Sequence, residues 1–243
     1  MRATNFEFRH RFWFIAAVFW IAFSLYWLDP VNVKDPLARW LRWDGLSGAG
    51  NQSLILWLAV ACAVGAVLIR VWATAYLRAD VMRDHALHTE RLVADGPYRH
   101  VRNPLYIGTN LIAWSMAPLA SRAGAPVLIV LMFLFTLRLI LREEAELRPA
   151  RGESYARFLE TVPRLIPSLL ARASASGARP QWAQALRGEG FVIAFACAVI
   201  GIAITRNLTV FWVLIAAGFV LAGLSRFMLS RGQSRAAAGP GGE

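Results

Sequence analysis

The stretch LVADGPYRHVRNPLYIG, residues 92–108, joins a Gly-Pro turn, two arginines and two tyrosines to the start of an apolar segment. Asn103 followed by Pro104 predicts a helix start, because Asn caps helix N-termini and Pro favours the first helical position. The new helix would therefore begin where charged side chains meet a hydrophobic run. Charged groups at membrane depth are costly, so this arrangement indicates a functional site.

The composition around this stretch is typical of an integral membrane protein. The chain has 243 residues, of which 57% are hydrophobic and 17% charged, with ten tryptophans and a mean hydropathy of +0.46. This profile predicts a polytopic all-α membrane protein. The net charge of +11 comes almost entirely from arginine, since Lys34 is the only lysine. Most of the arginines lie between the apolar segments, where they set membrane orientation, so we expect no nucleic-acid partner.

Six apolar segments are expected to be transmembrane helices, the last two forming a closing hairpin. They are residues 12–28, 53–77, 105–119, 126–141, 191–205 and 208–228. A helix needs about 20 apolar residues to cross the hydrocarbon core, so the third and fourth segments are short for a span.

The basic residues between these segments fall mainly on one side of the predicted membrane. That side, which carries both termini, holds Arg2, Arg9, Arg11, Arg78, Arg83, Arg91, Arg99, Arg102, Arg142, Arg148, Arg151, Arg157, Arg164, Arg172, Arg179 and Arg187. The opposite side holds Lys34, Arg39, Arg42, Arg122 and Arg206. The positive-inside rule therefore predicts cytoplasmic termini and a cytoplasmic functional site at 92–108. The preference for arginine over lysine suggests a bacterial inner membrane.

The chain is expected to divide into a membrane core at 1–170, a small-residue linker at 171–188, a terminal hairpin at 189–230 and a disordered tail at 231–243. The two cysteines, Cys62 and Cys197, lie in apolar runs without metal-ligand spacing. His85 and His88 have metal-like spacing, but a diiron site needs many more histidines than the four present. No metal is expected.

A second polar stretch begins where the fourth apolar segment ends. Glu143 and Glu144 are adjacent there. Ion pairs at a spacing of four residues, Arg142 with Glu146 and Glu144 with Arg148, would explain the acids as a solvated helix face. The alternative is that one glutamate pairs with the cationic group of a ligand.

The two stretches together carry a recognisable pattern. Its residues are Leu92, Val93, Gly96, Tyr98, Arg102, Pro104, Tyr106 and Gly108, followed by Glu143, Glu144, Leu147, Gly152, Tyr155, Val162, Pro163 and Pro167. This pattern resembles the isoprenylcysteine carboxyl methyltransferase family, within the integral membrane methyltransferases that include phospholipid methyltransferases. It covers residues 92–167, and it departs from the family at Asn103, where many members have His, and at Arg151, where Phe is usual.

The resemblance implies S-adenosylmethionine as methyl donor and a lipidic or lipidated acceptor that enters from the bilayer. The implied cofactor-binding residues are Leu92, Val93, Gly96, Tyr98, Asn103, Pro104, Tyr106 and Glu144. The implied catalytic residues are Arg102, which would orient an acceptor carboxylate or meet the carboxylate of the cofactor, and Glu143, which would accept a proton from an amine. Arg70 and Arg138, at membrane depth, would bind an anionic headgroup, pair with Glu143, or extend their charges to the membrane surface.

Several functions fit these residues. Methylation of a carboxylate is favoured, with N-methylation of a phospholipid as the alternative. A nicotinamide-dependent membrane reductase of the sterol-reductase type shares an Arg-His-Pro-x-Tyr-like segment, but it usually continues with Gly-Glu, whereas this chain has Gly108-Thr109. A non-enzymatic transporter or scaffold is the remaining alternative.

Overall fold

The computed structural model describes residues 1–41, 48–84 and 95–220, and all regular elements within these ranges are helical. The helices are α1 (Asn5–Arg9), α2 (Arg11–Ser24), α3 (Lys34–Leu41), α4 (Gly48–Asp84), α5 (Pro104–Met116), α6 (Gly124–Thr161), α7 (Trp182–Gly188), α8 (Gly190–Thr205) and a further helix at Leu208–Val220. Short 3-10 turns lie at η1 (Leu25–Trp27), η2 (Gly96–Arg99) and η3 (Ala117–Leu119). The predicted all-α class is confirmed for the described residues.

The helices agree in position with the six predicted segments, but fewer of them have the length and composition of a membrane span. Ala49–Leu77 and Gly124–Pro149 are long and apolar enough, and α7 with α8 would make a third span if this pair, bent by 64°, is counted as one. The expected span at 105–119 becomes α5, whose 13 residues extend about 20 Å, less than the hydrocarbon core of about 30 Å. Two or three spans are therefore supported, and six remain a prediction.

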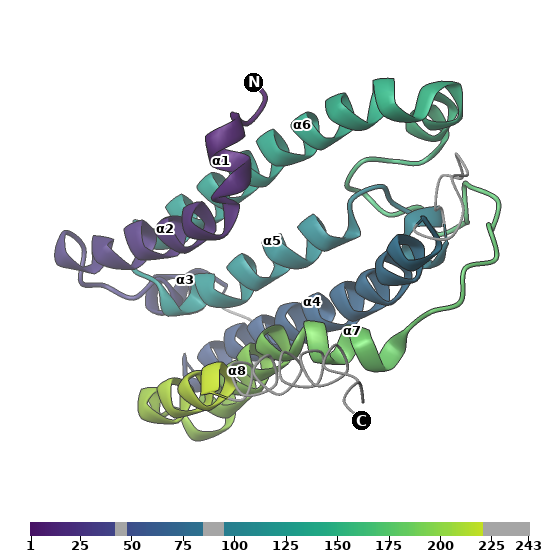
Figure 1. Cartoon of the computed structure of the whole chain (residues 1–243). Coiled ribbons are helices and arrows are strands. Elements are labelled where there is room, and N and C mark those ends of the chain that lie inside the picture. Colours follow the sequence, from purple (N-terminus) through teal and green to yellow (C-terminus); the bar gives the residue numbers. More distant parts are fainter. Residues whose placement is uncertain (42–47, 85–94, 221–243) are drawn as a thin grey trace, which may run out of the picture.

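The helices pack in a consistent order across the molecule. α2 packs against α6, α6 against α5, and α5 against α4 along most of its length. α7 and α8 lie along α4 on the side away from α6 (Figure 1). This order brings the start of α2, the second half of α4, the start of α5 and the second half of α6 to the same region.

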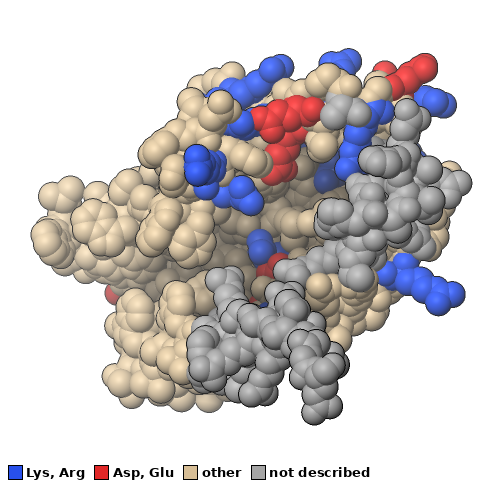
Figure 2. Space-filling view, in the orientation of Figure 1, with Lys and Arg blue, Asp and Glu red and all other residues tan. Residues whose placement is uncertain are grey.

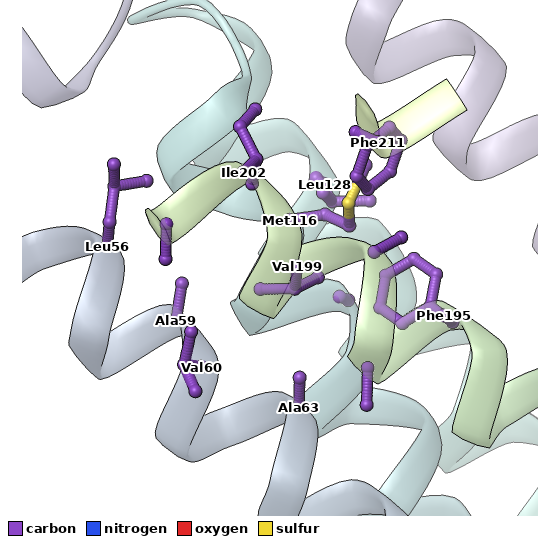
Figure 3. Packing of buried hydrophobic residues seen from close by; sticks show 14 of the residues in the cluster. Leu56, Ala59, Val60, Ala63, Met116, Leu128, Phe195, Val199, Ile202 and Phe211 are labelled. Atoms are coloured by element: carbon purple, nitrogen blue, oxygen red, sulfur yellow. The ribbon is translucent and has the colours of Figure 1, made fainter. Parts of the chain in front are cut away.

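The largest hydrophobic core joins the expected terminal hairpin to the other helices. Phe195, Val199 and Ile202 of α8 pack with Leu56 and Ala63 of α4 (Figure 3). Alanines fill many of the buried positions on α2, α4, α5 and α8, so the helix backbones approach closely. The hairpin at 189–230, as far as the structure describes it, therefore packs directly on the core helices.

The glycines of the hairpin have a structural use. A Cβ at Gly218 would lie 2.3 Å from the Cβ of Ala194, and one at Gly201 would lie 2.9 Å from a methyl group of Leu214. Both glycines therefore allow the two arms of the hairpin to touch. The third glycine of the predicted set, Gly223, lies outside the described residues.

The segment from the end of α6 to α7 is tied to the turn at η2 by backbone hydrogen bonds. The amide of Ser168 donates to the carbonyl of His100 at 2.9 Å, and the amide of Arg172 donates to the carbonyl of Arg99 at 2.8 Å. Figure 1 shows this segment passing around the end of α4 before it reaches α7. The expected linker is thus fixed against the first of the two sequence motifs.

Candidate active site

A cavity of about 570 Å³ lies between the first turns of α2, the second half of α4, the start of α5 and the second half of α6. Figure 2 shows this face hollowed between the helices, with basic and acidic side chains along its upper edge. The charged residues of the lining are Arg11, Arg70, Arg102, Arg151, Glu143 and Glu144. The described lining thus has more positive than negative charge, which favours a ligand with an anionic group.

Glu144 is the point at which the two sequence motifs meet. Its carboxylate receives the guanidinium of Arg102 at 2.9 Å and that of Arg164 at 2.7 Å. Glu144 is only 8% exposed, and a buried carboxylate is stable when it is paired and hydrogen-bonded in this way. The start of α5 and the exit of α6 therefore form one site.

The start of α5 is held by the segment that follows α6. The helix begins at Pro104 with Asn103 at the N-cap, as the sequence predicted. The Asn103 side chain makes no capping hydrogen bond and instead donates to the carbonyl of Arg164 at 3.2 Å. The amide of Arg102 donates to the carbonyl of Pro163 at 2.9 Å. These two bonds explain why both motifs are needed to build one site.

The adjacent acids on α6 have different partners. Successive helix residues point about 100° apart, so Glu143 and Glu144 face different neighbours. The hydroxyl of Tyr106 donates to Glu143 at 2.7 Å, and both residues line the cavity. Glu144 is bound by two arginines, while Glu143 has a neutral partner and is the better placed of the two for proton transfer.

One hydrogen-bond donor of Arg102 has no partner in the structure. Its side chain is 12% exposed, and its Nε–H is buried without a hydrogen-bond partner in the structure. Burial lowers the pKa of Arg102, and the neighbouring carboxylate of Glu144 opposes this shift. Burial, with Glu144 nearby, raises the pKa of the Tyr155 hydroxyl to about 12, so that residue remains a neutral phenol. A buried unpaired donor in a cavity wall fits the oxyanion of a ligand.

The two arginines predicted at membrane depth have different surroundings. Arg70 lines the cavity and pairs with Glu189 at 2.8 Å. Arg138 pairs with Glu7 at 2.7 Å and is absent from the cavity lining. Neither pairs with Glu143, so that alternative is wrong for the described structure. The reason is that an acid from another part of the chain reaches each arginine.

The structure describes only some of the predicted cofactor residues of the first motif. Leu92 and Val93 lie outside the described residues, and Tyr98 lines the cavity. Gly96 has a φ of 56°, and a Cβ there would lie 2.3 Å from the ring of Tyr76. The close approach that Gly96 permits is thus to Tyr76 of α4, whereas the resemblance implied a contact with the cofactor.

Three residues at the site had no site role predicted from the sequence. Arg11 lines the cavity from the start of α2 and was interpreted only as a topology signal. Arg164 lies within the second motif and was likewise interpreted only as a topology signal. Glu189, the partner of Arg70, stands alone before an apolar run, and such an acid could have been recognised as needing a basic partner.

Comparison of the sequence with known protein families adds evidence about this site. Residues 54–150 match the family described as phospholipid methyltransferase. This match confirms the resemblance to the integral membrane methyltransferases, and it indicates a membrane enzyme that transfers methyl groups. No curated protein and no solved structure matches the chain significantly.

The methyltransferase match places the site residues in two groups. Arg70, Arg102 and Glu144 lie within the matched residues. Arg164 and Glu189 lie beyond them, although each pairs with a residue of the first group. Residues beyond the matched range therefore supply the charged partners Glu189 and Arg164 to Arg70 and Glu144.

Proposed function

We propose that this protein is an S-adenosylmethionine-dependent methyltransferase whose acceptor is a lipidic carboxylate that reaches the cavity from the bilayer. The observation that carries the proposal is the contact between Arg102 and Glu144 in the wall of a large cavity. This contact joins the two motifs within a chain that matches a methyltransferase family.

The residues of the cavity fit this cofactor. S-adenosylmethionine supplies a methyl group on a sulfonium, together with a carboxylate and an ammonium that a protein can bind. Arg102, with its unpaired Nε–H, and the start of α5 at Pro104 would hold the carboxylate. Glu144 would hold the ammonium in place of Arg164, the more exposed of its two arginine partners. Tyr98 and Tyr106 offer aromatic surface for the adenine.

The apolar part of the lining supports a lipidic acceptor. Phe12 on α2 and Leu77 on α4 both line the cavity, and they are 62% and 42% exposed. In a membrane protein, exposed apolar side chains of this kind face lipid. The acceptor would therefore enter past Phe12 and Leu77 with its chain still in the bilayer. An ionised carboxylate needs no base, so the protein would act by positioning and by excluding water.

A second candidate is N-methylation of a phospholipid. It is favoured by the description of the matched family and by Glu143, whose carboxylate lies in the cavity wall beside Tyr106. A protonated amine must lose a proton before it can attack a methyl group, and Glu143 could accept it.

The orientation of the protein is also proposed. The sequence places most arginines on the side of the termini and of the cavity residues Arg102 and Arg151. By the positive-inside rule we propose that the cavity faces the cytoplasm, and from the preference for arginine over lysine that the membrane is a bacterial inner membrane.

Transfer of a labelled methyl group from S-adenosylmethionine into total membrane lipids, followed by mass spectrometry of the product, tests this proposal. Purified wild type should label a lipid, and the product mass with its fragmentation should show a methyl ester. A methylated amine would favour the second candidate. Oxidation of reduced nicotinamide cofactor without methyl transfer would contradict both and would support a reductase.

A further inference from the structure

A second ion pair lies in the cavity wall, separate from the pair between Arg102 and Glu144. The Nε of Arg70 donates to Glu189 at 2.8 Å, and the NH2 group donates to the other carboxylate oxygen at 3.2 Å. The hydroxyl of Thr74 donates to the same carboxylate at 2.7 Å. Glu189 is only 6% exposed. The guanidinium of Arg70 balances its buried charge, and Thr74 adds a hydrogen bond.

The other edge of the Arg70 guanidinium faces the cavity. Its NH1 group donates to the hydroxyl of Thr109 at 3.1 Å and to the carbonyl of Leu105 at 3.4 Å, and all three residues line the cavity. Both acceptors are neutral, so an ionised oxygen of a ligand would be a stronger acceptor than either. A ligand oxyanion could replace or share them at little cost, whereas the bidentate contact with Glu189 would remain.

The path of the Arg70 side chain across α5 is fixed by Gly108. A Cβ at position 108 would lie 2.3 Å from the Cγ of Arg70. The side chain therefore passes directly over this glycine. Gly108 belongs to the first sequence motif, and its lack of a side chain gives Arg70 access to the cavity.

The position of Glu189 depends on the break between α7 and α8. The two helices meet there at 64°. Ala185 of α7 is fully buried against Val71 and Ala75 of α4, which fixes α7 close to Arg70. The residue at the break is thus held against α4, and it comes from a part of the chain beyond the matched residues 54–150.

We propose that Arg70 binds the oxyanion of the lipid acceptor, a phosphate or a carboxylate, and that Glu189 is a positioning residue that holds Arg70 in the cavity wall. This inference rests on the proposed function and assigns the acceptor subsite within the same cavity. Arg70 lies within the span at Ala49–Leu77, at a depth where an anionic lipid group can reach it while the lipid chain stays in the bilayer. The terminal hairpin therefore completes the acceptor subsite.

Binding to the full-length protein in detergent tests the inference without relying on turnover. The probes are dihexanoyl phosphatidylethanolamine, which offers a phosphate, and oleate, which offers a carboxylate. Wild type should bind one of them, which identifies the oxyanion. Glu189→Gln should weaken that binding at least ~10-fold, about 1.4 kcal/mol, while the affinity for S-adenosylmethionine stays within about 2-fold. Glu7→Gln is the matched control, because it removes the Arg138 pair away from the cavity lining.

An exchange of charges separates acceptor binding from a merely structural ion pair. Arg70→Glu combined with Glu189→Arg keeps opposite charges at the two positions, so it should restore the melting temperature if Glu189→Gln lowers it. The exchanged protein should still fail to bind the lipid, because the group at the cavity wall is then anionic.

Three results would overturn the inference. They are wild-type lipid affinity in Glu189→Gln, wild-type lipid affinity in the exchanged protein, and binding of neither lipid by wild type. Failure of the proposed function would look different, since wild type would then bind no S-adenosylmethionine whatever its lipid affinity.

Discussion

The carboxylate of Glu144 accepts the guanidinium of Arg102 at 2.9 Å, and these residues come from two motifs separated by more than one full helix. Arg102 precedes α5, and Glu144 lies in the second half of α6. Their contact lies in the wall of the cavity, where Glu144 is only 8% exposed. Each motif alone resembles an ordinary membrane boundary, and their contact brings both into the wall of one cavity.

Replacing Arg102 tests its role in turnover. Arg102→Ala should lower kcat/KM for methyl transfer by more than ~10²-fold, the scale of losing a positioning contact. Arg102→Lys should recover little of this loss, because an ammonium cannot reproduce the fork of a guanidinium. Steady-state kinetics with the labelled cofactor provide the measurement. Activity within a few-fold of wild type in Arg102→Ala would remove this residue from the mechanism.

Glu143 distinguishes the two proposed acceptors. If the acceptor is an ionised carboxylate, no base is needed, and Glu143→Gln should keep turnover within ~10-fold of wild type. General base catalysis contributes about 10²–10⁴-fold, so a loss of that size would favour an amine acceptor. Tyr106→Phe removes the hydrogen bond to Glu143 and is the companion variant. The rates of both variants should be compared over a range of pH.

Gly96 is expected to be intolerant of a side chain. Gly96→Ala places a Cβ on a residue with φ of 56° and against the ring of Tyr76. The left-handed conformation alone should lower the free energy of unfolding by about 1–3 kcal/mol. Thermal unfolding in detergent measures the effect. Adding Tyr76→Ala should relieve the clash but not the backbone strain, so complete rescue by the double variant would contradict this explanation.

Asp95 should make the stability of the segment after α6 depend on pH. Its carboxylate accepts the amides of Ser176 at 2.9 Å and Ala178 at 2.7 Å. Burial alone would raise the pKa of Asp95, but the hydrogen bond from the Ser176 hydroxyl, together with these amides, outweighs burial and holds the pKa below its ordinary value. A lowered pKa in the folded state stabilises the fold above the unfolded pKa of about 3.9, and the contribution disappears as the pH falls through the folded pKa.

The variant Asp95→Asn tests the predicted direction in which stability changes with pH. It should melt at a lower temperature than wild type at pH 7, and the difference should shrink below about pH 4 as the wild-type carboxyl is protonated. Glu153→Gln, a change at an exposed residue of α6, is the control. A difference that stays constant from pH 7 to pH 3 would show that the charge of Asp95 does not stabilise this segment.

Much of the site was predictable because its motifs carry local signals. The start of α5 at Pro104 follows from Asn-Pro chemistry. The expected topology put the start of the third apolar segment and the end of the fourth on one side of the membrane, but the pairing of Arg102 with Glu144 was not predicted. The cap itself was not predictable, because the Asn103 side chain is drawn to the carbonyl of Arg164, which no local rule specifies.

Long-range partners and helix lengths were harder to predict. Nothing near Arg70 indicates Glu189, since the pair joins residues far apart in the sequence and depends on the break between α7 and α8. The apolar segment at 126–141 is short, yet α6 continues through charged residues that pack or pair, giving a span at Gly124–Pro149. Hydropathy detects the apolar part of a helix, whereas tertiary contacts set its length.

The central claim is that S-adenosylmethionine is held between the start of α5 and the exit of α6, and a titration of this cofactor measures it most directly. Isothermal titration calorimetry of detergent-purified wild type should show saturable binding that S-adenosylhomocysteine competes for. Glu144→Gln should abolish the binding while the melting curve still shows a folded protein. Glu146→Gln, which changes an exposed acid of the same helix, should bind like wild type. Equal affinity in wild type and Glu144→Gln would contradict the account.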